Sequence, residues 1–235
     1  MGLSEIAAHP EQVPFTLLVL MLAFAFHEFA HAYTADRFGD PTPRSMGRVT
    51  LNPRVHLDPL GMLLIFLVGF GWAKPVLINP NHFRRPRLMN LIVSVAGPLA
   101  NLLLAALGML SLYILQAANA FDGMSHGLLV AVSLFFPTMI NLNLVLFQFN
   151  LLPLPPLDGY RILESLLPVR LRVKLAGVSQ WFVFVFLLFV FVPSLSSARL
   201  GRLFGLEGPI FKGIDAGLAM LFGFPFDWSI LNILT

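Results

Sequence analysis

The chain has 235 residues, of which 57% are hydrophobic and 11% are charged, whereas a soluble domain carries about 25% charged residues. The mean hydropathy of +0.80 indicates an integral membrane protein. Although the net charge is +3, the basic residues lie in short loops between apolar runs, which argues against binding of nucleic acid. The absence of cysteine excludes disulfides and thiolate metal sites, so any metal must be held by histidine and carboxylate.

The first predicted membrane span, Val13 to Phe38, carries an H-E-x-x-H motif. His27 and His31 are four residues apart, so on a helix both imidazoles lie on one face and can bind one ion. Glu28 can reach a water on that ion, which is the layout of a zinc hydrolase with two ligands and a general base. The alternative is a pair of buried histidines beside a stray carboxylate. Ionisable groups in a span cost roughly 2.5–3.5 kcal/mol each, which favours a functional site.

The region after the first span contains two short unusual segments. Residues 60–72 are apolar, but they are too few and too rich in glycine for a clean crossing, which predicts a re-entrant or interfacial element. Residues 74–80 read as a short extended segment, and Pro75 and Pro80 confine it to the edge of a sheet. We therefore expect a re-entrant or short β element between the first and second full spans.

Three further apolar runs are long enough to cross a membrane, and they are Leu88–Ala118, Leu128–Asn150 and Leu175–Val192. The first of these carries Gly97-Pro98-Leu99-Ala100-Asn101, where small residues and a mid-helix proline predict close packing against a neighbour. Residues 211–222 form an amphipathic or marginal helix, and the topology of residues 199–235 stays open.

The sequence therefore predicts an all-α polytopic membrane protein with about four full transmembrane helices. We expect a single domain over residues 1–235, with a catalytic core at about 13–174 and a C-terminal span and tail at 175–235.

The basic residues also predict an orientation. Eight of them lie between Arg37 and Arg87, four more lie between Arg161 and Lys174, and none precedes Arg37 or lies in residues 119–126. Under the positive-inside rule the N-terminus is outside, and both basic regions are cytoplasmic. This places the histidine pair and Asp158 toward the cytoplasmic side of what we expect to be a prokaryotic cell membrane.

A catalytic zinc needs a third protein ligand. Asp36 points off the face of His31, and His56 and Asp58 are loop residues that more often cap or turn the chain. Asp158 is the strongest candidate, because it follows a proline-rich break that could unwind a helix inside the bilayer. The alternative for Asp158 is a helix cap before Tyr160.

Two stretches of the sequence together resemble the site-2 protease family of intramembrane zinc metalloproteases. They are Phe26-His27-Glu28-Phe29-Ala30-His31 and Asn150-Leu151-Leu152-Pro153-Leu154-Pro155-Pro156-Leu157-Asp158-Gly159. Flanking motifs resemble the compact prokaryotic branch, which lacks the PDZ and CBS domains that many relatives carry. They include Gly47-Arg48-Val49-Thr50-Leu51-Asn52-Pro53, Gly71-Trp72-Ala73-Lys74-Pro75-Val76 and Gly97-Pro98-Leu99-Ala100-Asn101.

The resemblance implies one Zn²⁺ per chain, bound by His27, His31 and Asp158, with Glu28 as the general base. It also implies that Asn150 stabilises the oxyanion, although a helix-packing amide is the alternative for this residue. The expected substrate is a transmembrane protein or peptide, in a lipid environment and without nucleic acid. Its identity, any regulatory partner and the oligomeric state are not predicted.

Residues 74–79 could form an edge strand that pairs with unwound substrate, and a loop at the membrane interface is the alternative. Three other functions predict different sequence features. A metal transporter would show several intramembrane ligand groups on facing spans. A CaaX-type membrane metalloprotease should use a helical glutamate, but the only glutamates after His31 are Glu164 and Glu207, and neither lies in a span. A non-catalytic scaffold would not need Glu28.

Overall fold

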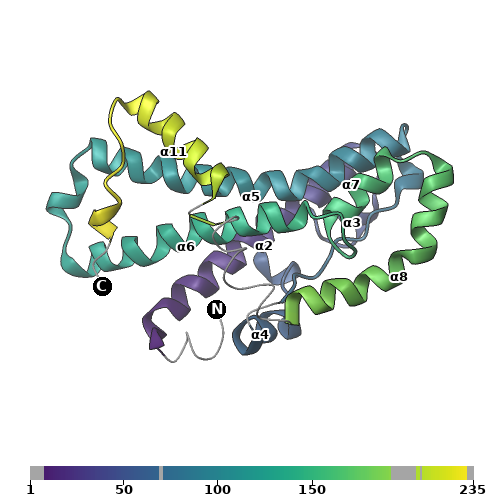
Figure 1. Ribbon diagram of the computed structural model, residues 1–235, viewed down its shortest axis with the longest axis horizontal. Coiled ribbons are helices and arrows are strands. Elements are labelled where there is room, and N and C mark those ends of the chain that lie inside the picture. The colour runs from purple at the N-terminus through teal and green to yellow at the C-terminus, as the bar shows by residue number, and fades with distance from the viewer. Residues whose placement is uncertain (1–7, 69–70, 192–204, 207, 232–235) are drawn as a thin grey trace.

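The computed structural model describes residues 8–68, 71–191, 205–206 and 208–231, and helices are its main regular elements (Figure 1). The α-helices in chain order are α2 (Val13–Arg37), α3 (Thr42–Ser45), α4 (Pro59–Val68), α5 (Pro86–Ala117), α6 (His126–Asn150), α7 (Asp158–Leu166), α8 (Val169–Phe191) and α11 (Pro209–Phe222). Short 3-10 turns lie between them at Pro10–Gln12, Pro53–Val55, Pro80–His82, Ala120–Gly123 and Trp228–Leu231.

Helices α2, α5 and α6 pack against one another and form the body of the protein. These are also the three helices that are long and apolar enough to cross a membrane, over Pro10–Arg37, Pro86–Ala117 and His126–Asn150. At 1.5 Å per residue, the 32 residues of α5 span roughly 48 Å, more than the 30 Å of a hydrocarbon core. Helix α5 therefore reaches both ends of the body, and other helices pack against it at each end.

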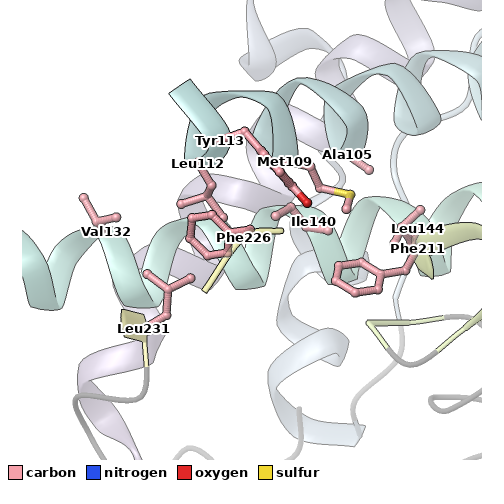
Figure 2. Close-up of a cluster of buried hydrophobic side chains, with 10 residues drawn as sticks. All are labelled: Ala105, Met109, Leu112, Tyr113, Val132, Ile140, Leu144, Phe211, Phe226 and Leu231. Carbon is pink, nitrogen blue, oxygen red and sulfur yellow. The ribbon is translucent and has the colours of Figure 1, made fainter. Parts of the chain in front are cut away.

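The opposite ends of α5 carry different partners (Figure 1). At one end α5 packs against α7, and at the other end it packs against α11. Figure 2 shows the second end, where residues from α5, α6, α11 and the tail form a buried apolar cluster around Met109 and Tyr113. The Tyr113 ring lies within 6.2 Å of the rings of Phe222, Phe224 and Phe226.

The predicted spans agree with the long helices within a few residues, and the predicted helix at 211–222 is α11. The fourth predicted span, Leu175–Val192, falls on α8 except for Val192, which lies outside the described residues. Helix α8 is not among the three helices identified as long and apolar enough, so a fourth crossing stays a prediction. The predicted division at residue 174 likewise stays a prediction.

The region predicted as re-entrant or β contains the ten-residue helix α4 and no strand within the described residues. A single antiparallel bridge joins Leu57 and Ala73, supported by the N–H of Lys74, which donates to the His56 carbonyl oxygen at 2.8 Å. The backbone donors of the following segment go to buried carboxylates instead. The Val76 N–H donates to Glu28, and the Asn79 N–H donates to Asp40. The extended segment is therefore fixed by side chains and not by a neighbouring strand.

Candidate metal centre

The two histidines of α2 lie one turn apart and face the interior of the helical body. Both are buried, and their Nε2 atoms are 3.1 Å apart. Their rings are nearly perpendicular, at 84°, with centroids 4.7 Å apart. The i, i+4 spacing on one helix thus brings two imidazole nitrogens to one point, as the motif predicts.

Asp158, the first residue of α7, completes this group. Its Oδ2 lies 3.1 Å from Nε2 of His27 and 3.2 Å from Nε2 of His31. The residue before α7, Leu157, is the N-cap, and no side-chain hydrogen bond caps the helix. The carboxylate of Asp158 therefore faces the histidines, and the capping alternative is not what the structure has.

The three ligand atoms fit the donor set and the spacing of a zinc site. A tetrahedral ion with bonds of about 2.0–2.1 Å separates its ligand atoms by roughly 3.3 Å, close to the 3.1–3.2 Å seen here. Two imidazoles and a carboxylate are ligands that suit zinc. Within the described residues, His27, His31 and Asp158 are the one group of three that could hold a metal ion.

The other ring nitrogen of each histidine is anchored to an oxygen that can only accept. Nδ1 of His27 lies 2.7 Å from Oδ1 of Asn101, and Nδ1 of His31 lies 2.7 Å from the Val93 carbonyl oxygen. Each Nδ1 must therefore carry the proton, which leaves the lone pair of Nε2 for a metal ion. Both anchors come from α5, so the packing of α5 on α2 sets the tautomers.

The Asn101 amide is itself held in one orientation. Its Nδ2 donates to Oδ1 of Asn143 at 2.9 Å and to the Ala23 carbonyl oxygen at 3.4 Å. Nδ2 of Asn143 donates to the Met139 carbonyl oxygen at 2.8 Å. Both amides are completely buried. This chain of amides joins α2, α5 and α6 and fixes which atom of Asn101 faces His27.

Two glycines allow the elements to approach this closely. A Cβ on Gly97 of α5 would lie 2.3 Å from Nε2 of His31 and 2.8 Å from Cε1 of His27. A Cβ on Gly159 would lie 2.3 Å from the Leu152 carbonyl oxygen. No side chain fits at either position. Glycine is therefore required at residue 97 for α5 to cover the histidines, and at residue 159 for the first turn of α7 to pack against the preceding loop.

Glu28 is buried next to the histidines and is held by the segment that follows α4. Its Oε2 accepts the Val76 N–H at 2.9 Å and lies 3.9 Å from Nη2 of Arg48. Arg48 is buried and also donates to the Lys74 carbonyl oxygen. In the described part of the chain, Oε1 of Glu28 accepts no hydrogen bond, so it is available to a water or a substrate.

Residues 74–82, which we call the strap, are anchored at their far end by Asp40. This completely buried carboxylate accepts the Asn79 N–H at 2.7 Å and lies 2.9 Å from Nδ1 of His82. Thr42 donates to it through both its N–H and its hydroxyl. Burial alone would raise the pKa of Asp40, but the hydrogen bonds from Thr42, Asn79 and His82 outweigh it and hold the pKa below its ordinary value.

The other ligand candidates from the sequence are engaged elsewhere. Nε2 of His56 lies 2.7 Å from the Thr50 carbonyl oxygen, and Oδ1 of Asp58 accepts the Gly61 N–H in the first turn of α4. Asp36 forms a two-contact ion pair with Arg44. None of the three belongs to the metal-binding group within the described residues.

Asn150, the predicted oxyanion donor, is the last residue of α6. Its Nδ2 donates to the Leu146 carbonyl oxygen at 2.9 Å, one turn back in the same helix. The structure records no hydrogen bond from Asn150 to His27, His31 or Asp158 within the described residues. The role of Asn150 therefore stays a prediction.

A comparison with protein-family models settles the family. Residues 15–193 match peptidase family M50. The chain belongs to peptidase family M50, the site-2 protease family. The family resemblance read from the two motifs is confirmed, and so is the class of enzyme it implies.

Curated relatives of this M50 peptidase point the same way. It is 47% identical over 187 residues to "Putative zinc metalloprotease YwhC" of Bacillus subtilis, a match that covers 79% of this chain and 83% of the relative. It is 35% and 36% identical to two proteins named "Putative zinc metalloprotease Rip2", from Mycolicibacterium smegmatis and Mycobacterium tuberculosis. Those matches cover 75% and 84% of this chain and 66% and 75% of the relatives. No solved structure gives a significant match.

The sequence of this M50 peptidase does not reveal which residues hold His27, Glu28 and the strap in place. The sequence alone does not identify Asn101, Arg48 or Asp40 as such supports. The available signals were an asparagine inside a long apolar helix and ionisable residues in short loops beside the histidine motif. Each of these residues acts through a contact far away in sequence, such as the 74 positions that separate Asn101 from His27.

Proposed function

We propose that this M50 peptidase is an intramembrane zinc endopeptidase that cleaves peptide bonds within or near transmembrane segments of membrane proteins. The observation that carries the proposal is the convergence of His27, His31 and Asp158, with ligand atoms 3.1–3.2 Å apart, beside a buried carboxylate on α2. The names of the relatives support zinc as the metal. When bound, zinc supplies Lewis-acid activation of water and of the scissile carbonyl.

Glu28 is the proton carrier in this proposal. The Val76 N–H fixes Oε2, which leaves Oε1 to take a proton from the attacking water and return it to the leaving amine. The nearby guanidinium of Arg48 compensates the buried negative charge of Glu28. His27 and His31 each donate an Nδ1 proton to an oxygen of α5, so Nε2 of each ring faces the ion. Proton transfer of this kind typically contributes 10²–10⁴-fold.

Two finer parts of the proposal concern the substrate. Asn150 would stabilise the oxyanion, which requires its amide to leave the Leu146 carbonyl. The strap would bind unwound substrate along its exposed side, where Leu77 is 59% exposed. We place the N-terminus outside and the metal centre toward the cytoplasm, as the distribution of basic residues predicts.

The test is Glu28→Gln in the purified full-length protein. This substitution keeps the size and a hydrogen-bond acceptor for Val76 but removes the base. We expect zinc content to stay at one ion per chain while cleavage of a single-span reporter falls by at least 10²-fold. The matched control is Glu11→Gln, an exposed glutamate near the start of α2, which should change neither measurement. Equal cleavage by Glu28→Gln and wild type would reject the proposal.

The metal-transporter alternative is not favoured, because the described residues hold one group of metal ligands and no series of them.

A further inference from the structure

A cavity of about 240 Å³ lies between the strap and helices α5 and α7. It is lined by residues 76–78 and Pro80 of the strap, by Asn90 of α5, and by Arg161 and Glu164 of α7. Ligand pockets for drug-sized molecules measure about 300–1,000 Å³. The cavity is therefore of a size for one or two side chains.

Each element that lines this cavity also contacts the metal centre. The contacting residue is at most about one helical turn from the residue that lines the cavity. The strap wall includes Val76, whose N–H binds Glu28. On α7, Arg161 is three residues after Asp158. On α5, Asn90 is three residues before Val93, whose carbonyl oxygen binds His31. A helical turn rises about 5.4 Å, and an extended peptide advances about 3.3 Å per residue. A side chain in the cavity thus belongs to a residue within about three positions of a peptide bond held at the metal centre.

The lining of the cavity is polar and carries both charges. Arg161 is exposed and Glu164 is half-buried, and neither side chain has an ion-pair or hydrogen-bond partner in the part of the chain that the structure describes. Nδ2 of Asn90 donates to Oγ of Ser165 at 2.9 Å, which joins α5 to α7 behind the cavity. Two unpaired opposite charges, three residues apart on α7, therefore face the same space.

We propose that this cavity is a subsite for a substrate residue close to the scissile bond, and that Arg161 and Glu164 select an uncharged polar side chain such as glutamine. A carboxamide can accept from the guanidinium of Arg161 and donate to the carboxylate of Glu164. A lysine at this position of the substrate meets the like charge of Arg161 as well as the opposite charge of Glu164, and a glutamate meets the reverse. The two contributions therefore oppose each other for either charged residue. The inference rests on the proposed function for its substrate class.

The first experiment measures binding without cleavage. The chain has no cysteine, so a single introduced cysteine reports one position only. In the full-length Glu28→Gln protein, Arg161→Cys is tested for disulfide formation with single-span reporters in which one cysteine is moved residue by residue along the sequence. The control is Arg170→Cys, an exposed arginine in the first turn of α8 that does not line the cavity.

We expect Arg161→Cys to cross-link at one or two adjacent reporter positions and Arg170→Cys to show no such preference. Equal cross-linking along the reporter from both variants would overturn the subsite. This result does not depend on hydrolysis. Clustered cross-links in a protein whose wild type cleaves no reporter would reject the proposed function and retain the cavity as a binding site.

The second experiment measures selection. Reporters with glutamine, lysine or glutamate at the cross-linked position are compared by kcat/KM in wild type, Arg161→Gln and Glu164→Gln. We expect wild type to prefer glutamine, Arg161→Gln to improve the lysine reporter relative to glutamate, and Glu164→Gln to do the reverse. Each change should be roughly two- to fivefold, the range of partly exposed ion pairs. Unchanged ratios in both variants, with normal zinc content, would overturn the assignment of specificity to these residues.

Discussion

The two ends of α5 are built by opposite means. Around Gly97 and Asn101, α5 meets α2 and α6 through buried polar side chains, each with its own hydrogen-bond partner. Around Met109 and Tyr113, the same helix meets α6, α11 and the tail through apolar and aromatic packing (Figure 2). The polar end depends on geometry, because each unsatisfied buried group costs about 1–3 kcal/mol. The stability of the apolar end depends on how well its side chains fill the space. It tolerates substitutions that keep the total side-chain volume.

The largest effect is expected at Gly97, where α5 comes closest to the histidines of α2. Gly97→Ala places a methyl group 2.3 Å from Nε2 of His31, so α5 must move away and the metal centre must open. We expect loss of bound zinc and of cleavage, measured by metal analysis and a reporter assay. The matched change at the apolar end is Gly108→Ala, whose Cβ would lie 3.1 Å from Cγ1 of Ile140. Equal zinc loss in both variants would show that the two ends do not differ.

The next effect concerns the support of one ligand. Asn101→Ala removes the acceptor for Nδ1 of His27 and leaves that donor buried. Loss of a partner of this kind typically lowers metal affinity 10–100-fold, so we expect a weaker zinc dissociation constant in a competition titration with a chelator. Asn141→Ala, an exposed amide on α6, is the control. Unchanged affinity in Asn101→Ala would mean that the packing of α5 alone orients the ring.

A smaller effect is expected at the anchor of the strap. Asp40→Asn weakens the contacts to Asn79 and His82, so the strap should loosen and cleavage should fall while zinc stays bound. We expect a loss of about 1–3 kcal/mol in the free energy of unfolding.

The pH dependence of the Asp40 anchor follows from its pKa. The pKa of Asp40 is held below its ordinary value of 3.8 by the hydrogen bonds of the fold. Its contribution to stability is therefore complete above the unfolded-state pKa and is lost as pH falls through the lower, folded-state pKa. The difference in stability between wild type and Asp40→Asn should be constant from about pH 5 to 8 and shrink in acid. A difference that grows toward acid would contradict this assignment.

The smallest effect is at the apolar end. Tyr113→Phe removes the hydroxyl that donates to Oδ1 of Asp215 at 2.8 Å but keeps the ring. We expect a loss of about 1 kcal/mol in thermal unfolding measured in detergent, with zinc content and cleavage unchanged. A fall in cleavage without a change in stability would show that the aromatic cluster is coupled to the metal centre.

The sequence predicts those features of the fold and the site that depend on local geometry or on a strong sequence pattern. The spacing of His27 and His31 determines their common face because helix geometry is local, and Asp158 was found because a proline-rich break precedes it. The sequence predicts that residues 74–80 form an extended segment at the edge of a sheet, because of Pro75 and Pro80. In the fold its donors go to Glu28 and Asp40, and both contacts depend on how distant segments pack. The roles of Asn101 and Arg48 could not be predicted for the same reason.

The distance along the chain between the metal ligands has a consequence for biosynthesis. Asp158 is 127 positions after His31, so a ribosome has made all three long helices before the last proposed ligand leaves the exit tunnel. Until then α2 and α5 can assemble the anchored imidazoles, but the candidate metal centre has only two of its three proposed ligands. The nascent protease therefore gains its hydrolytic capacity late, after much of its own chain has entered the membrane beside other newly made proteins.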